Sequence, residues 1–136
     1  MTKTITISYV LPGSPEKVWR TLTEAQLLAK WLMENDIAPI PGHKFTMRSR
    51  PMGDWDGTVS CEVIEAIPNE KLAYSWRGGS GKTALDTVVT WTLEAHGTGT
   101  KLLLEHSGFT DDTSAAFNAM SGGWASKQAE LAALSA

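Results

Sequence analysis

Cysteine, long hydrophobic runs and clustered positive charge are all scarce in this 136-residue sequence. The single cysteine, Cys61, excludes an internal disulfide framework and is typical of a reducing cytoplasm. No apolar run approaches the roughly 18 residues of a membrane-spanning helix. The net charge is −3 without a basic block, which disfavours nucleic acid as a partner. Residues 1–7 alternate like a strand and lack a signal-peptide core. We therefore predict a cytoplasmic protein with neither membrane nor nucleic acid as partner.

Patterns that bind metals or cofactors are missing as well. His43, His96 and His106 lack the spacing of metal ligands, so we expect no metal. The segment Gly79–Thr83 resembles part of a phosphate loop, but Trp76 stands where the motif needs its first glycine, and an alternating run follows instead of a helix. We predict a hairpin loop there, and no cofactor.

Catalytic patterns are equally hard to find. The acidic residues of the predicted strands fall opposite the apolar faces, and the sequence contains no Gly-x-Ser-x-Gly motif. Cys61 is predicted to be a small buried apolar residue. These observations leave His106 as the one candidate for acid–base chemistry.

Tryptophan, by contrast, is abundant, with six residues against two tyrosines and three phenylalanines. Because tryptophan is bulky and seldom fully buried, six of them predict a large, partly open apolar interior. The length favours a single domain over residues 1–136, with enough apolar surface for its own core.

Alternation of apolar and polar residues predicts six strands joined by short links. They lie near 4–9, 43–50, 55–65, 71–77, 85–93 and 102–106. Two short helices over 14–33 begin at Ser14, a good N-cap, and Pro15. A long helix over 115–133 ends the chain. The pattern predicts an α+β helix-grip fold, in which a curved antiparallel sheet of six or seven strands surrounds the C-terminal helix.

The predicted C-terminal helix has one apolar face and two interior glycines. The face residues recur at spacings of three and four: Phe117, Met120, Trp124, Gln128 and Leu131. Glycine in a helix interior costs roughly 1 kcal/mol relative to alanine. We therefore interpret Gly122 and Gly123 as leaving space between helix and sheet.

Several short motifs occur in the order and spacing of a known superfamily. They are Ser14–Trp19, Leu22-Thr23 and Trp31, then Gly57–Val59, Pro68 with Leu72–Trp76, Gly99–Leu102, His106–Phe109 and Gly123-Trp124. With these motifs the chain resembles the START/Bet v 1-like (SRPBCC) superfamily. Within it, the chain resembles bacterial proteins similar to the C-terminal domain of the Hsp90 ATPase activator (AHSA1-like). The resemblance implies a seven-stranded sheet, so one predicted strand would be split, for which the run Trp55–Glu65 is the candidate. Members include lipid carriers, cyclases, hydroxylase domains and co-chaperone modules, so the resemblance does not fix the function.

The shared faces predict the lining of a cavity between sheet and helix. The predicted ligand-binding residues are Phe45, Met47, Tyr74, Trp76, Trp91, Leu93, Leu104, His106, Met120 and Trp124. Trp31 and Trp55 stand at element ends, where a pocket mouth is expected. His106 is predicted to be inward, neutral, and close to Tyr74 or a backbone carbonyl.

Three functions remain open at this point. The leading hypothesis is a binding protein for a small apolar or aromatic molecule, without catalysis. The second is a cyclase- or hydrolase-like enzyme with His106 as acid or base and Tyr74 as hydrogen-bond donor. The third is a protein-interaction module of the stress or co-chaperone kind. The eukaryotic activators use an additional N-terminal domain for the chaperone, so we do not expect that activity here. A homodimer also remains open.

Overall fold

The computed structural model describes residues 2–53 and 55–136. Seven strands form one antiparallel sheet with the order β1-β7-β6-β5-β4-β3-β2. The strands are β1 (Lys3–Leu11), β2 (Glu34–Asn35), β3 (Lys44–Arg48), β4 (Thr58–Ile67), β5 (Lys71–Gly78), β6 (Leu85–His96) and β7 (Gly99–Phe109). Apart from the step from β1 to β2, which passes through two helices, consecutive strands are neighbours in the sheet, as the short predicted links required.

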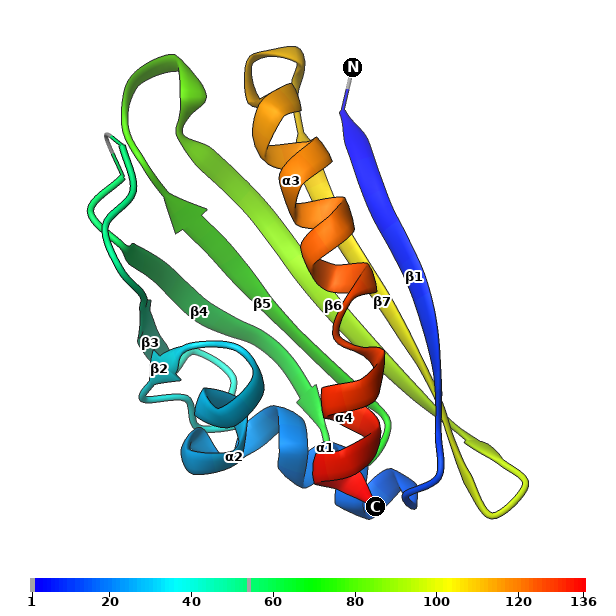
Figure 1. The fold of residues 1–136 in the computed structure, drawn as a ribbon. Coiled ribbons are helices and arrows are strands. Elements are labelled where there is room, and N and C mark those ends of the chain that lie inside the picture. The colour runs from blue at the N-terminus through cyan, green and yellow to red at the C-terminus, as the bar shows by residue number, and fades with distance from the viewer. Residues whose placement is uncertain (1, 54) are drawn as a thin grey trace.

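Two helices follow β1 and two more end the chain. They are α1 (Pro15–Thr23), α2 (Ala25–Trp31), α3 (Ser114–Ala125) and α4 (Gln128–Ser135). Ser14 caps α1, because its side chain accepts a hydrogen bond from the Lys17 amide at 3.3 Å. Figure 1 shows α3 and α4 running across one face of the curved sheet, with α1 and α2 beside α4. This arrangement confirms the predicted helix-grip α+β fold.

The seventh strand is not where the sequence predicted it. Strand β4 runs unbroken from Thr58 to Ile67, with only a register shift between Val63 and Glu65, so the predicted split of Trp55–Glu65 is wrong. The additional strand is β2, which pairs with β3 at the sheet edge. A strand of two residues is too short to show an alternating pattern, which is why it escaped detection.

The predicted long C-terminal helix is also wrong in one respect, because α3 and α4 are separated at Ser126 and Lys127. The Lys127 amide there donates to the carbonyl of Trp124 at 3.2 Å, a tighter turn than that of an α-helix. Gly122 and Gly123 are exposed on α3, and a Cβ at either would have no atom within 4 Å. The expectation that these glycines make space against the sheet is therefore wrong.

The inward face of the sheet agrees with the predicted register. Trp76 on β5 and Trp91 on β6 are 4% and 0% exposed and belong to the hydrophobic core. Cys61 is buried in the same core, where burial and the nearby Asp36 raise the pKa of its thiol to about 12. Within the described ranges, no helix is both long and apolar enough to span a membrane.

Candidate functional site

Aromatic side chains fill one region between the sheet and the C-terminal helices, which we call the closed core. Tyr9, Trp31, Trp91 and Trp124 meet there, and none is more than 3% exposed. The ring centroids of Trp91 and Trp124 are 5.6 Å apart, and those of Trp31 and Trp91 are 5.9 Å apart, both in edge-to-face geometry. Such packing is favourable for aromatic pairs and leaves no room for a ligand.

A chain of hydrogen bonds joins this core to the sheet. The Tyr9 hydroxyl donates to the carbonyl of Trp124 at 2.6 Å, and the Trp124 Nε1–H donates to His106 Nδ1 at 3.0 Å. His106 Nε2 lies 2.8 Å from Thr87 Oγ1, which donates to the carbonyl of Trp76 at 2.9 Å. The chain links β1, α3, β7, β6 and β5, so it holds α3 against the sheet.

These partners determine the state of the imidazole. An indole N–H can only donate, so His106 Nδ1 must be the unprotonated acceptor. The Thr87 hydroxyl donates its hydrogen to the Trp76 carbonyl, so its oxygen accepts a hydrogen bond from a protonated His106 Nε2. Burial lowers the pKa of His106 to about 3, so the ring is neutral at pH 7, as the sequence predicted.

The predicted partnership of His106 with Tyr74 does not occur. The Tyr74 hydroxyl instead accepts a hydrogen bond from Trp91 Nε1 at 3.1 Å, and burial raises its pKa. The partners of His106 are two side chains, from Thr87 and Trp124. Both ring nitrogens are thus engaged inside the core, and His106 is 0% exposed. The arrangement is that of a structural histidine that positions α3.

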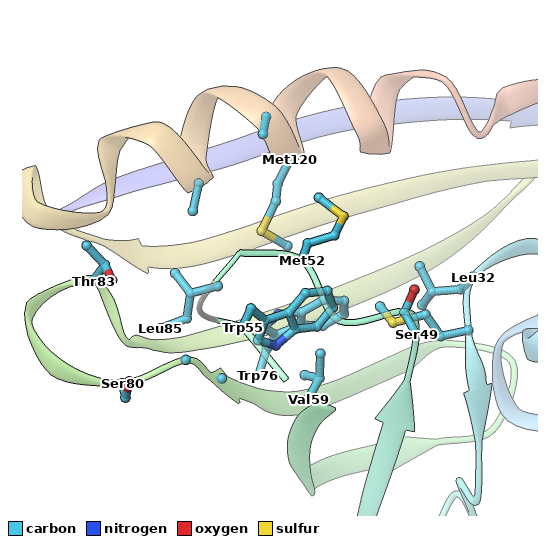
Figure 2. A pocket seen from close by; sticks show the side chains of 15 residues that line it. Leu32, Ser49, Met52, Trp55, Val59, Trp76, Ser80, Thr83, Leu85 and Met120 are labelled. Carbon is cyan, nitrogen blue, oxygen red and sulfur yellow. The ribbon is translucent and has the colours of Figure 1, made fainter. Parts of the chain in front are cut away.

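A second region beside the closed core is open, and we call it the pocket. Its volume is about 810 Å³. Figure 2 shows it between α3, the residues at 49–53 and 55–57, and the loop at 79–84. The lining residues are Leu32, Met33, Ser49, Met52, Trp55, Val59, Trp76, Gly78, Gly79, Ser80, Thr83, Leu85, Ala116, Ala119 and Met120. Ten of these fifteen carry apolar or indole side chains, and no ionisable side chain is among those of the described residues.

The loop that carries Trp55 is held in place by its backbone. Met52 and Trp55 exchange two backbone hydrogen bonds, of 3.0 and 2.9 Å. Gly57 has a φ of +85°, and a Cβ there would lie 2.3 Å from the carbonyl oxygen of Ser49, so only glycine fits. The Trp55 Nε1–H donates to the carbonyl of Thr58 at 2.9 Å. These contacts fix one indole at the pocket wall.

Of the ten predicted ligand-binding residues, the structure places Trp76 and Met120 in the pocket wall. The other eight are buried in the interior away from the pocket lining: Phe45, Met47, Tyr74, Trp91, Leu93, Leu104, His106 and Trp124. Trp55 lines the pocket, as expected for a residue at its mouth. Trp31 does not, because it is buried and its Nε1–H donates to the carbonyl of Thr21 at 3.0 Å.

Sequence reasoning missed most of the pocket wall because much of it comes from loops. Leu85 was within reach, since it shares the alternating face of Trp91 on the same strand. Ala116 was also within reach, four residues before Met120 on the helix. The loop Gly79–Thr83 has no periodic pattern that would mark it as part of a pocket wall. It forms the predicted turn between strands, with a short 3-10 helix at Gly81–Thr83, and it supplies the pocket rim.

Comparison with solved structures places the fold among bacterial proteins. Protein MLL2253 from Mesorhizobium loti is 36% identical over 97% of this chain and 96% of its own, with a TM-score of 0.87. Protein BH1534 from Bacillus halodurans is 24% identical over the whole of both chains, with a TM-score of 0.80. DynU16, a protein in the dynemicin biosynthetic locus, is 21% identical over 95% of this chain and 45% of its own, with a TM-score of 0.76. No curated protein matches the sequence significantly.

The family comparison covers nearly the whole chain. The family described as activator of Hsp90 ATPase homolog 1-like protein matches residues 12–136. Its fold is typically a ligand-binding scaffold, which agrees with the resemblance identified from the motifs. The chain belongs to this AHSA1-like family.

Proposed function

We propose that this protein binds a small apolar or aromatic molecule in the pocket and does not transform it. The observation that carries the proposal is the pocket itself, about 810 Å³ in volume, with a mainly apolar lining. This volume lies within the range of sites that enclose drug-sized ligands. The rim residues Met52, Ser80 and Thr83 are exposed, so a ligand can enter from solvent.

The enzyme hypothesis loses its main support at His106. A general acid or base must reach the substrate, whereas both nitrogens of His106 are bonded to Thr87 and Trp124. Tyr74, the expected donor, is engaged by Trp91. Among the described lining residues the side-chain hydroxyls are those of Ser49, Ser80 and Thr83, and no His, Asp or Glu accompanies them to activate a nucleophile.

The structural similarity to DynU16 is compatible with the proposal. DynU16 is a protein of the dynemicin biosynthetic locus. At 21% identity, this similarity shows only that the two proteins share a fold. It is consistent with a scaffold that holds a small organic molecule, and we base the proposal on the pocket of this chain.

The test is native mass spectrometry of the purified protein, followed by titration with Prodan, a neutral naphthalene dye whose emission reports an apolar environment. We expect saturable binding with one equivalent of dye and quenching of tryptophan fluorescence. Ala116→Trp places an indole in the pocket and should weaken Prodan binding by at least about tenfold. Ile64→Ala, at an exposed position outside the pocket, should not change Prodan binding. Prodan binding that is equal in all three proteins would overturn the proposal.

A further inference from the structure

We infer that the pocket selects an uncharged planar ring system over a charged molecule or an alkyl chain of similar size. The inference rests on the proposed function, because it names the class of ligand that the same pocket accepts. It is carried by three features of the wall: the lack of ionisable groups among its described residues, two fixed indoles on one side, and flexible thioethers on the other.

The first feature, the lack of ionisable side chains among the described lining residues, disfavours a charged ligand. The described lining residues offer no ionisable side chain that could pair with a ligand carboxylate or ammonium group. Next to the pocket, Arg77 and Asp86 form an ion pair with each other at 2.9 Å, and both side chains are largely exposed. A charged group buried against these residues would therefore lose water without gaining a partner, which is strongly unfavourable.

The second feature favours a flat ring. Trp76 is held by edge-to-face packing against Trp124, with ring centroids 5.7 Å apart, and it lies 5.4 Å from the His106 ring. Trp55 is held by its hydrogen bond to the Thr58 carbonyl. Both indoles are thus ordered before any ligand arrives, so stacking a ring against them costs little side-chain entropy. The binding free energy of an alkyl chain comes from the apolar area that it buries. An aromatic ring buries area as well and adds favourable edge-to-face or stacked contacts with the indoles.

The third feature is the facing wall. In Figure 2, Met120 reaches down from α3 and Met52 lies beside it, on the side of the pocket opposite Val59. Methionine adapts its shape and makes favourable contacts between sulfur and aromatic rings. The exposed hydroxyls of Ser80 and Thr83 at the rim can donate hydrogen bonds to carbonyl or phenol oxygens on the ring.

Three matched competitors test the inference by displacement of bound Prodan. Methyl 2-naphthoate is neutral and planar, methyl undecanoate is neutral and flexible with the same number of carbons, and 2-naphthoate is planar and anionic at pH 7. We expect methyl 2-naphthoate to bind about two- to tenfold more tightly than methyl undecanoate, the range that aromatic contacts supply. We expect 2-naphthoate to bind at least about tenfold more weakly than its ester.

Variants assign the preference to the indole wall. Trp55→Leu should remove most of the preference for methyl 2-naphthoate while leaving the affinity for methyl undecanoate within about twofold, which also shows that the pocket is intact. Trp55→Phe should retain the preference, and Ile64→Ala should match the native chain in every assay.

The ranking of the three competitors in the native chain decides the inference. Equal or stronger binding of methyl undecanoate, or of 2-naphthoate, would overturn it while leaving the proposed binding function standing. Failure of Prodan and all three competitors to bind would instead overturn the proposed function, and the inference with it.

Discussion

The closed core and the pocket lie beneath the same helix, and they differ in the side chains that α3 presents. Ala116, Met120 and Trp124 follow one another at intervals of four residues, so they lie along one stripe of the helix. Trp124 fills the space at one end through contacts with Trp31, Trp76 and Trp91. The small Ala116 leaves the other end empty. The gradient of side-chain size along α3 thus determines where this fold is packed and where it is hollow.

The closed core and the pocket also differ in their hydrogen bonds. The closed core contains the chain from Tyr9 through Trp124, His106 and Thr87, and across the described residues no buried side-chain nitrogen or oxygen lacks a partner. The hydroxyls of Ser80 and Thr83 at the pocket rim face solvent. A satisfied network favours one rigid arrangement, whereas exposed hydroxyls remain free to meet a ligand. One region serves stability, and the other is suited to binding.

The largest expected effect is the loss of a large side chain from the closed core. Trp124→Ala removes the aromatic contacts with Trp31, Trp76, Trp91 and His106 together with the hydrogen-bond donor to His106. We therefore expect the free energy of unfolding to fall by about 3–5 kcal/mol. Met120→Ala on the same stripe should cost about 1 kcal/mol, because that side chain is only partly buried. Urea denaturation measures both. Similar losses for the two variants would contradict the distinction between the regions.

The second effect concerns pH. The pKa of His106 is about 3 in the folded protein against an ordinary value of 6.5, so between these values the unfolded chain binds more protons than the folded one. The stability from the neutral ring is present above about pH 6.5 and is lost as the pH falls toward 3. From pH 7 to pH 5 we expect this group to cost about 2 kcal/mol.

The variant His106→Leu isolates this contribution. It should be less stable at pH 7 by about 1–3 kcal/mol, since the Trp124 N–H is left buried without its acceptor. It should also lack the part of the decline between pH 7 and pH 5 that comes from the histidine. Parallel pH profiles for the two proteins, measured by urea denaturation, would show that His106 is not the group responsible.

A smaller effect is expected when the pocket is filled. Ala116→Trp should weaken Prodan binding by at least about tenfold, equivalent to about 1.4 kcal/mol, because the indole occupies the ligand volume. Its melting temperature should stay within a few degrees of the native value, since the new side chain enters existing space. A large loss of stability with retained binding would show that this end of the interior is packed.

The smallest expected effect is that of a substitution on the exposed side of α3, opposite its buried stripe. Gly123→Ala should stabilise the protein by up to about 1 kcal/mol, because alanine favours the helix and its methyl group meets open space. Prodan affinity should be unchanged. A decrease in melting temperature would contradict the structure at this position.

Much of the fold was predictable because it depends on periods that the backbone imposes. Alternation assigned Trp76, Trp91 and His106 to the inner face, and helical spacing did the same for Trp124. The break at Ser126 and Lys127 was not predictable, because the apolar spacing continues across it to Leu131. Periodicity reports which way a side chain points and says nothing about a local change of backbone geometry.

The position of the pocket was predictable only in part, for a different reason. An inward side chain lines a cavity only when its neighbours fail to fill the space, and those neighbours come from distant segments. His106, for example, is surrounded by partners 18 and 19 residues away. The irregular loops that carry Met52 and Ser80 follow no period at all. The sequence could therefore predict which side chains point inward. Whether their neighbours fill the space around them could be learned only from the three-dimensional structure.

The most direct test of the two-region account is a two-dimensional NMR spectrum of the tryptophan indole N–H signals during titration with methyl 2-naphthoate. Trp55 lines the pocket, whereas Trp91 donates to Tyr74 inside the closed core. The account predicts a saturable shift of the Trp55 signal, assigned from its loss in Trp55→Phe, with the Trp31, Trp91 and Trp124 signals almost unmoved. Large shifts of these three signals with a stationary Trp55 would contradict it.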